Sequence, residues 1–152
     1  FLRTSAPAVF AAGDIAAWPD PTFGRRLQIE HWDVARRQGT RAGRNMAGDM
    51  KPYSDLPYFY SDLFDLSFEV WGDLSGWETT VRRGAPARGG FAFYYFAENR
   101  LCGVLSAGRP DGERKAMPAL VKSRPAYADI ADRITDEATD LNVLLSVGEG
   151  PA

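Results

Sequence analysis

Residues 90–105 read GFAFYYFAENRLCGVL, two apolar runs separated by a short polar turn at residues 98–100. This pattern is typical of an antiparallel hairpin, because each run has the length and the aromatic content of a strand. Alternate side chains of a strand point to opposite faces of its sheet. One aromatic row is therefore expected in the sheet core, and the other against helices or at an interface.

The segments on either side of this hairpin extend the same domain. Residues 66–71 alternate apolar with other side chains, and residues 77–83 are expected to pair with them after a turn at residues 72–76. Beyond residue 111, apolar residues at helical spacing predict two short helices separated at Pro125. This part of the chain therefore predicts an α+β domain with C-terminal helices.

The first fifty residues have a different composition. Residues 9–12 predict a buried strand, and residues 17–28 predict a loop or an irregular hairpin. A helix is expected from residue 30 to 46, where Gly39 and Gly43 weaken it unless they pack closely against a sheet or a cofactor. Gly48 is the expected C-terminal stop. A domain boundary is therefore predicted near residue 50.

Composition excludes several classes of protein. A formal net charge of −2 over 152 residues argues against a nucleic-acid surface, which needs a concentrated basic face. Arginine pairs such as Arg36–Arg37 are more often solvated faces than anion sites. Cys102 is the only cysteine, so we expect a reducing cytoplasm and no disulfide framework. No apolar run is long enough to span a membrane.

One carboxylate is a candidate ligand-binding group. Asp14 follows Gly13 at the expected end of the strand at residues 9–12, and ligands of open α/β sheets bind outside such strand ends. A carboxylate there can accept hydrogen bonds from sugar-alcohol hydroxyls, although an ordinary turn aspartate is the alternative. The helix start at Glu30 favours the ligand site, because free N–H groups and a partial positive charge are found there.

The other candidate residues each have a structural alternative, and a lone histidine is more often structural than catalytic. His31 is the only histidine and has no partner at catalytic or metal-ligand spacing, so it is either structural or a general base. Trp32 either packs in a core or lies beside a planar ring. The aromatic cluster around Tyr60 either seals the second domain or covers a flavin or a base.

Six segments resemble one family. They are AVFAAGD at residues 8–14, GRR at 24–26, EHWDVA at 30–35, QG at 38–39, NMAG at 45–48 and FYSDL at 59–63. Together they resemble the C-terminal part of FAD-dependent pyridine-nucleotide oxidoreductases, a family that includes ferredoxin and rubredoxin reductases and the apoptosis-inducing factor group. The resemblance is strong up to Leu63 and looser across the second domain.

The resemblance implies a fold and a cofactor. Residues 1–50 would be the end fragment of an α/β FAD-binding domain, and residues 51–152 an interface domain with a five-stranded antiparallel sheet and C-terminal helices. Gly13 and Asp14 match the segment that binds the ribityl hydroxyls of FAD. Glu30, His31 and Trp32 match the helix start that faces the isoalloxazine, with Glu30 and His31 near the nicotinamide side. Tyr60 stands where many relatives have a tryptophan beside the flavin.

Two functions follow as hypotheses. The first is a fragment of a flavoprotein that passes electrons from NAD(P)H through FAD to a protein or small-molecule acceptor. The glycine-rich fingerprints that hold both dinucleotides are not in the chain, so we expect the fragment alone to be inactive and assign no catalytic residue. The alternative is a non-catalytic interaction or dimerisation module. Self-association is expected through exchange of residues 1–14 or of the helix at residues 30–46.

Overall fold

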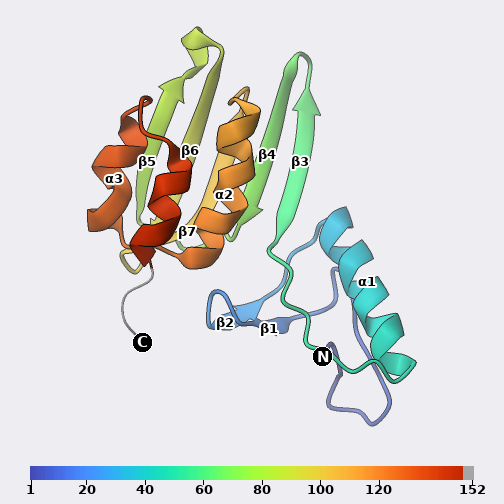
Figure 1. The fold of residues 1–152 in the computed structure, drawn as a ribbon. Helices are drawn as coiled ribbons and strands as arrows, with labels where there is room; N and C mark the ends of the chain where they lie inside the picture. The colour runs from blue at the N-terminus through green and yellow to red at the C-terminus, as the bar shows by residue number, and fades with distance from the viewer. Residues whose placement is uncertain (149–152) are drawn as a thin grey trace. The chain divides into compact units, whose positions relative to one another are not determined.

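A five-stranded antiparallel sheet forms the centre of the second of two units, Phe1–Phe59 and Tyr60–Ala152 (Figure 1). The structure is a computed structural model that describes residues 1–148. The strands follow the order β3-β4-β7-β6-β5. Their bounds are Tyr58–Leu63 for β3, Leu66–Gly72 for β4, Thr79–Ala85 for β5, Gly90–Ala97 for β6 and Arg100–Ala107 for β7.

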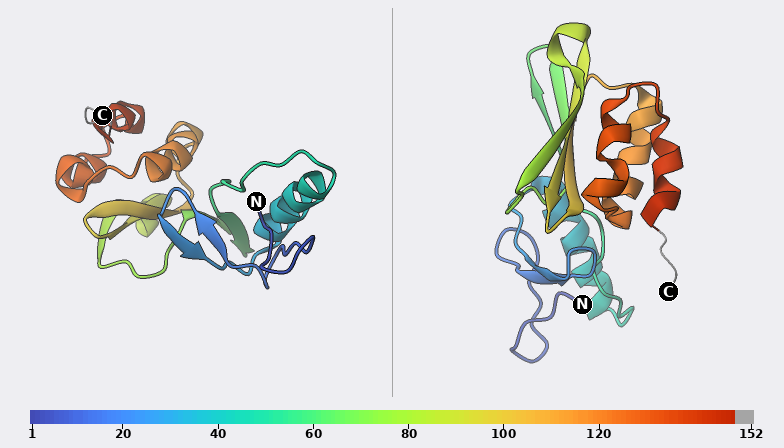
Figure 2. Two further views of the ribbon diagram at one scale, coloured as in Figure 1. Left: turned by 90° about the horizontal axis from the view of Figure 1, so that it is seen from below. Right: turned by 90° about the vertical axis from the view of Figure 1, so that its left-hand side faces the viewer.

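Helices cover one face of this sheet, as the edge-on view in Figure 2 shows. They are α2 (Asp111–Ser123), α3 (Tyr127–Thr135) and the 3-10 helix η2 (Leu141–Gly148). A further short 3-10 helix, η1 (Pro86–Arg88), connects β5 to β6. The predicted α+β class, with a five-stranded antiparallel sheet and C-terminal helices, is therefore confirmed.

The hairpin of β6 and β7 is confirmed as well. Its two turn residues, Glu98 and Asn99, have φ angles of 51° and 60°. Positive φ at both positions matches the twist of the flanking strands. On β6 the buried row is Ala92, Tyr94 and Phe96, and the Phe96 ring contacts Tyr127 of α3 with 5.1 Å between centroids. The opposite row is Phe91, Phe93 and Tyr95, and it is only partly buried.

The predicted pairing of residues 66–71 with 77–83 is wrong. β4 pairs with β7 and β5 pairs with β6, so the two strands are separated by the central hairpin. After β4, the Asp73 amide donates a hydrogen bond to the Cys102 carbonyl of β7 at 2.9 Å. The chain therefore still lies beside β7 after β4 ends. β5 then reaches β6 through η1 and Gly89, a short loop with a small closure cost.

In the first unit, the expected strand at residues 9–12 is not formed. Phe10 makes an isolated antiparallel bridge with Arg3, and Val9 is 48% exposed. A strand needs neighbours that satisfy its backbone groups, and no parallel neighbour pairs with residues 9–12 in the described part of the chain. The alternative of an irregular hairpin at residues 17–28 is confirmed by β1 (Trp18–Asp20) and β2 (Arg25–Leu27).

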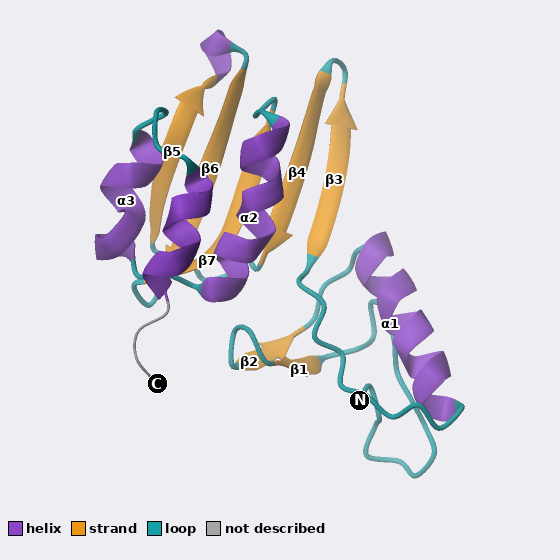
Figure 3. Ribbon diagram, in the orientation of Figure 1, coloured by secondary structure: helices purple, strands orange, loops and turns teal. Residues whose placement is uncertain are grey.

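Helix α1 (Trp32–Met46) confirms the predicted helix with a slightly later start, and Gly48 follows its C-cap with φ 99°. The buried face of α1 carries Val34, Gln38, Ala42 and Asn45, as well as Asp33. Gly39 and Gly43 are exposed, with no atom within 4 Å of a Cβ placed there. The close packing expected of these glycines is therefore not found within residues 1–148. Figure 3 shows the same elements coloured by secondary structure.

A buried arginine joins the sheet of the second unit to its helices. The Arg83 side chain on β5 is 1% exposed and forms two hydrogen bonds of 3.0 and 3.1 Å with the Glu113 carboxylate of α2. Its remaining donors reach main-chain carbonyls at the end of α3 and in the loop after it. These acceptors are Ile134, Asp136, Glu137 and Thr139, at 2.6–3.0 Å.

A second arginine shares the same carboxylate. Arg109 donates to Glu113 at 2.9 and 2.7 Å and to the Glu137 carboxylate at 2.9 Å. Burial raises the pKa of Glu113, but the hydrogen bonds from Arg109 and Arg83 outweigh it and leave this pKa below its usual value. Arg109 likewise lowers the pKa of Glu137. This group of four charged residues is called the Arg83 cluster below.

We predict that Glu113→Gln lowers the free energy of unfolding by about 3 kcal/mol at neutral pH, because it leaves a buried guanidinium without its counter-charge. Chemical denaturation measures the change, and Glu98→Gln in the exposed β6–β7 turn is the control. Because both carboxyls have lowered pKa values in the folded state, their stabilisation is present above the ordinary glutamate pKa of about 4.3 and is lost as pH falls below it. In Glu113→Gln the free energy of unfolding should therefore fall less steeply as the pH is lowered. An unchanged pH dependence contradicts the role of the Arg83 cluster.

Candidate functional site

The Gly13–Asp14 turn is held against helix α1 of the first unit. The Gly13 amide donates to Oε1 of Gln38 at 2.8 Å in a buried hydrogen bond. Gly13 has φ 79°, and a Cβ at this position would lie 3.3 Å from the Cβ of Ala35. A glycine is required because the backbone both adopts a left-handed conformation and approaches the helix closely. This contact fixes the position from which the next residue projects.

Asp14 is exposed beside this buried glycine. Its main-chain carbonyl accepts a hydrogen bond from Nε2 of Gln28 at 2.7 Å, while its carboxylate has no partner among residues 1–148. An ordinary turn aspartate usually bonds its own backbone two residues ahead. The Asp14 carboxylate is instead available to accept hydrogen bonds from a ligand.

His31 is the N-cap of α1. Its backbone is extended, and its Nδ1 accepts a hydrogen bond from the Asp33 amide at 3.3 Å. The imidazole also lies 5.1 Å from the Phe59 ring, centroid to centroid. The structure thus gives His31 a structural role, and its contact with a cofactor stays a prediction.

The first turn of α1 carries a mixed set of groups. Trp32 is 68% exposed, with the Arg36 guanidinium 5.4 Å from its ring centroid, so it is not part of the core of the first unit. Asp33 accepts hydrogen bonds from Arg36 at 3.0 Å and Arg37 at 2.5 Å. Since an anion near a helix N-terminus is favourable, these contacts stabilise the start of the helix.

Two predicted residues have less defined surroundings. Glu30 is exposed just before the helix. Tyr60 is 56% exposed on β3 and belongs to the second unit, so its contribution to a site with Asp14 stays a prediction. The structure brings Gly13 and Asp14 to the first turns of α1, whose N-terminus carries His31 and Trp32.

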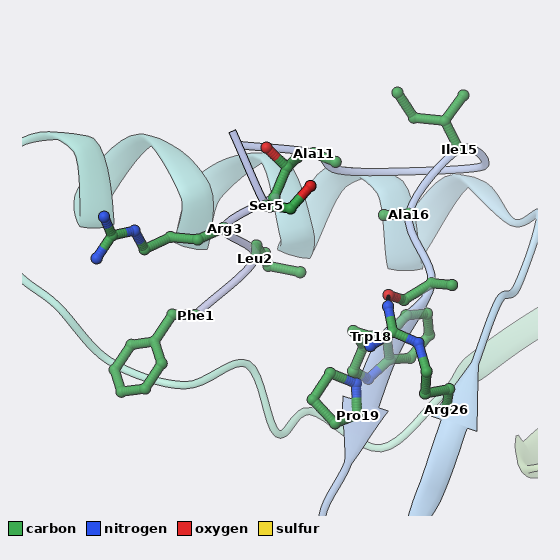
Figure 4. A pocket seen from close by; sticks show the side chains of 12 residues that line it. Phe1, Leu2, Arg3, Ser5, Ala11, Ile15, Ala16, Trp18, Pro19 and Arg26 are labelled. Carbon is green, nitrogen blue, oxygen red and sulfur yellow. Dashed lines mark hydrogen bonds between the residues drawn. The ribbon is translucent and has the colours of Figure 1, made fainter. Parts of the chain in front are cut away.

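A pocket of about 670 Å³ is lined by residues that follow the Gly13–Asp14 turn in the chain (Figure 4). Its wall is formed by the N-terminal arm and by residues 15–19, and Arg26 crosses it to donate to the carbonyl of Ala17. None of the predicted cofactor residues lines it. Among the described residues there is also no group of three or more potential metal ligands, and no helix long and apolar enough to cross a membrane.

Two side-chain amides organise the first unit, although the sequence segments that contain them did not reveal this role. Gln38 holds the Gly13 turn, and Asn45 donates to the carbonyls of Phe1 and Lys51 at 2.7 and 3.0 Å. Asn45 also accepts from the amide of Lys51 at 2.9 Å. The available signal was their spacing, because both amides share a helix face with Val34 and Ala42. Polar residues at positions where the helical spacing predicts apolar ones indicate buried hydrogen bonds.

We predict that Gln38→Leu frees the Gly13–Asp14 turn while leaving α1 folded. Leucine has a similar size to glutamine but lacks the Oε1 atom that accepts the hydrogen bond from the Gly13 amide. Amide hydrogen exchange by NMR should show faster exchange at Gly13, by about tenfold or more for a lost hydrogen bond of about 1.5 kcal/mol. Gln28→Leu, which removes only the contact to the Asp14 carbonyl, is the matched control. Equal Gly13 protection in both variants contradicts the anchoring role of Gln38.

This chain is similar to known reductases in both sequence and structure. The model of the family described as "Reductase C-terminal" matches residues 58–145. Monodehydroascorbate reductase from Pisum sativum is 33% identical over 86% of this chain and 32% of its own length. The ferredoxin–NAD(+) reductase component of the anthranilate 1,2-dioxygenase system from Burkholderia cepacia is 39% identical over 60% of this chain and 23% of its own length.

Among solved structures, the ferredoxin reductase for the CYP199A2 system from Rhodopseudomonas palustris has a TM-score of 0.80 at 25% identity. The match covers 95% of this chain and 35% of that one. This chain thus spans about a third or less of the length of these relatives. Because the family model covers more than half of the chain, the chain belongs to the reductase C-terminal family.

Proposed function

We propose that this chain forms the C-terminal part of an FAD-dependent oxidoreductase that takes electrons from NAD(P)H and passes them to a protein or small-molecule acceptor. The exposed, unpartnered Asp14 carboxylate on its anchored turn carries the proposal. Membership of a reductase family and the names of the similar proteins support it. In this proposal residues 1–50 belong to the FAD-binding domain and residues 51–152 to the interface domain.

The residues of the first unit fit a flavin in chemical type. The Asp14 carboxylate is an acceptor suited to ribityl hydroxyls, and the hydrogen bond from the Gly13 amide to Gln38 anchors the backbone that carries it. The N-terminus of α1 presents main-chain N–H groups and a partial positive charge, which suit an electron-rich carbonyl edge. The bound flavin would supply the hydride and electron chemistry, while these groups bind and orient it.

The remaining predicted residues are assigned by position. Glu30 and His31 are proposed to lie near the nicotinamide side, and Trp32 and Tyr60 to offer aromatic surfaces to the ring. Trp32 favours this role because most of its indole is exposed. A cytoplasmic location is proposed because the sequence has a single cysteine, Cys102, and so no disulfide framework of its own.

We predict that Asp14→Ala in the intact reductase weakens FAD retention by about tenfold or more, because hydrogen bonds to a charged acceptor are worth about 1.5–3 kcal/mol. The ratio of flavin absorbance to protein absorbance after dialysis measures the loss. Asp65→Ala, at the exposed β3–β4 turn, is the control for removing a surface carboxylate. Flavin content unchanged by Asp14→Ala excludes the assigned role.

The 152-residue chain alone should bind FAD weakly, and tight stoichiometric binding by it contradicts the proposed division of the site.

Self-association of the chain is also proposed, as part of its role as an interface module. The first unit exposes several apolar side chains, with Ile15 at 82%, Met46 at 63% and Val9 at 48%. Such side chains favour association when they are not covered.

Light scattering across a wide concentration range should show a mass above 16.8 kDa that falls in the double variant Ile15→Ser, Met46→Ser. Leu66→Ser, on the sheet of the second unit, is the control. A monomer at every concentration contradicts self-association.

A further inference from the structure

A basic groove of about 430 Å³ runs along helix α1 within the first unit. One wall consists of α1 side chains and the other of the segment at residues 51–55. Arg36, Arg37, Arg41 and Arg44 line the helix wall, and Lys51 and Tyr53 belong to the opposite wall. None of the proposed flavin-binding residues lines this groove.

The groove has an excess of positive charge. Four of its five cationic side chains form ion pairs, and they do so with three carboxylates, those of Asp33, Asp49 and Asp55. The charge excess is therefore two, and the Arg44 guanidinium has no ion-pair partner among residues 1–148. Arg37, Arg41 and Arg44 follow one another at helical spacing, so their Cα atoms extend over about 10 Å of the helix axis.

Two buried donors in the same groove lack acceptors. Tyr53 is 4% exposed, and its hydroxyl has no hydrogen-bond partner among the described residues. Nε of Arg41 is likewise buried without a partner. The Tyr53 ring packs edge-on against Trp18 with 5.5 Å between centroids, which accounts for the ring but not for the hydroxyl.

The Tyr53 hydroxyl is a donor at neutral pH. Burial, together with the nearby Asp55 carboxylate, raises the pKa of Tyr53. Buried polar groups in native proteins almost always have partners, so an unsatisfied hydroxyl and an unsatisfied guanidinium nitrogen on residues of one groove point to an absent acceptor. The groove is the place from which an acceptor can approach them, because both Arg41 and Tyr53 line it.

We propose that this groove binds a small phosphate-bearing anion with the length of a diphosphate. Guanidinium groups match phosphate oxygens with paired hydrogen bonds, and the row of three arginines exceeds the length of a single phosphate. A flat acidic protein surface suits the groove less well, since its carboxylates cannot reach the buried Tyr53 hydroxyl. The inference is independent of the proposed flavin site.

The test is isothermal titration calorimetry of the 152-residue chain with inorganic diphosphate, at an ionic strength of about 0.15 M. We expect saturable binding of one diphosphate per chain. Tyr53→Phe, which keeps the ring and its packing, and Arg44→Gln should each weaken binding by about tenfold. Lys115→Gln, an equal charge change on α2 of the second unit, is the matched control and should leave the affinity unchanged.

Three results overturn the proposal. One is the absence of saturable heat with a chain whose thermal unfolding shows it to be folded. Another is equal weakening by Lys115→Gln, which indicates diffuse attraction of anions. The third is tighter binding of a polyglutamate peptide than of diphosphate, with no effect of Tyr53→Phe, which indicates a protein-docking surface.

Discussion

The second unit depends on one buried guanidinium. Arg83 lies on an edge strand, yet its donors are all used by a carboxylate on α2 and by four main-chain carbonyls around the end of α3. A buried charge is tolerated only when it is paired and fully hydrogen-bonded. Because its partners come from two helical segments, satisfying Arg83 also sets how those segments cover the sheet.

The first unit uses neutral amides for a comparable purpose. Gln38 fixes the Gly13 turn against α1, and Asn45 ties the chain at Phe1 and at Lys51 to the end of the same helix. Helix α1 thus positions segments that are distant in sequence. Its own start is stabilised by His31, whose ring accepts the capping hydrogen bond from the Asp33 amide. The proposed flavin contacts lie at the N-terminus of this helix, and the proposed anion groove runs along its side chains.

Local patterns predicted the parts of the fold that local interactions determine. The hairpin at residues 90–105, the helices on either side of Pro125 and the helix ending before Gly48 are all confirmed. In each case the spacing of apolar residues and the turn chemistry lie within a short stretch of chain. The partner of residues 77–83 was wrongly predicted, because pairing depends on which strand is nearest after the whole sheet has formed. The strand at residues 9–12 failed because a strand is defined by its neighbours.

The same division applies to the candidate sites. The sequence by itself singled out Gly13 and Asp14 as candidates and indicated the family, because the six segments that carry the resemblance are short and local. Only the tertiary structure decided that Gln38 holds this turn, that His31 caps α1 and that Gly39 and Gly43 face outward. It also decided that the Tyr53 hydroxyl is buried without a partner. Burial and hydrogen bonding join residues far apart in the chain, and no local pattern specifies which of them meet.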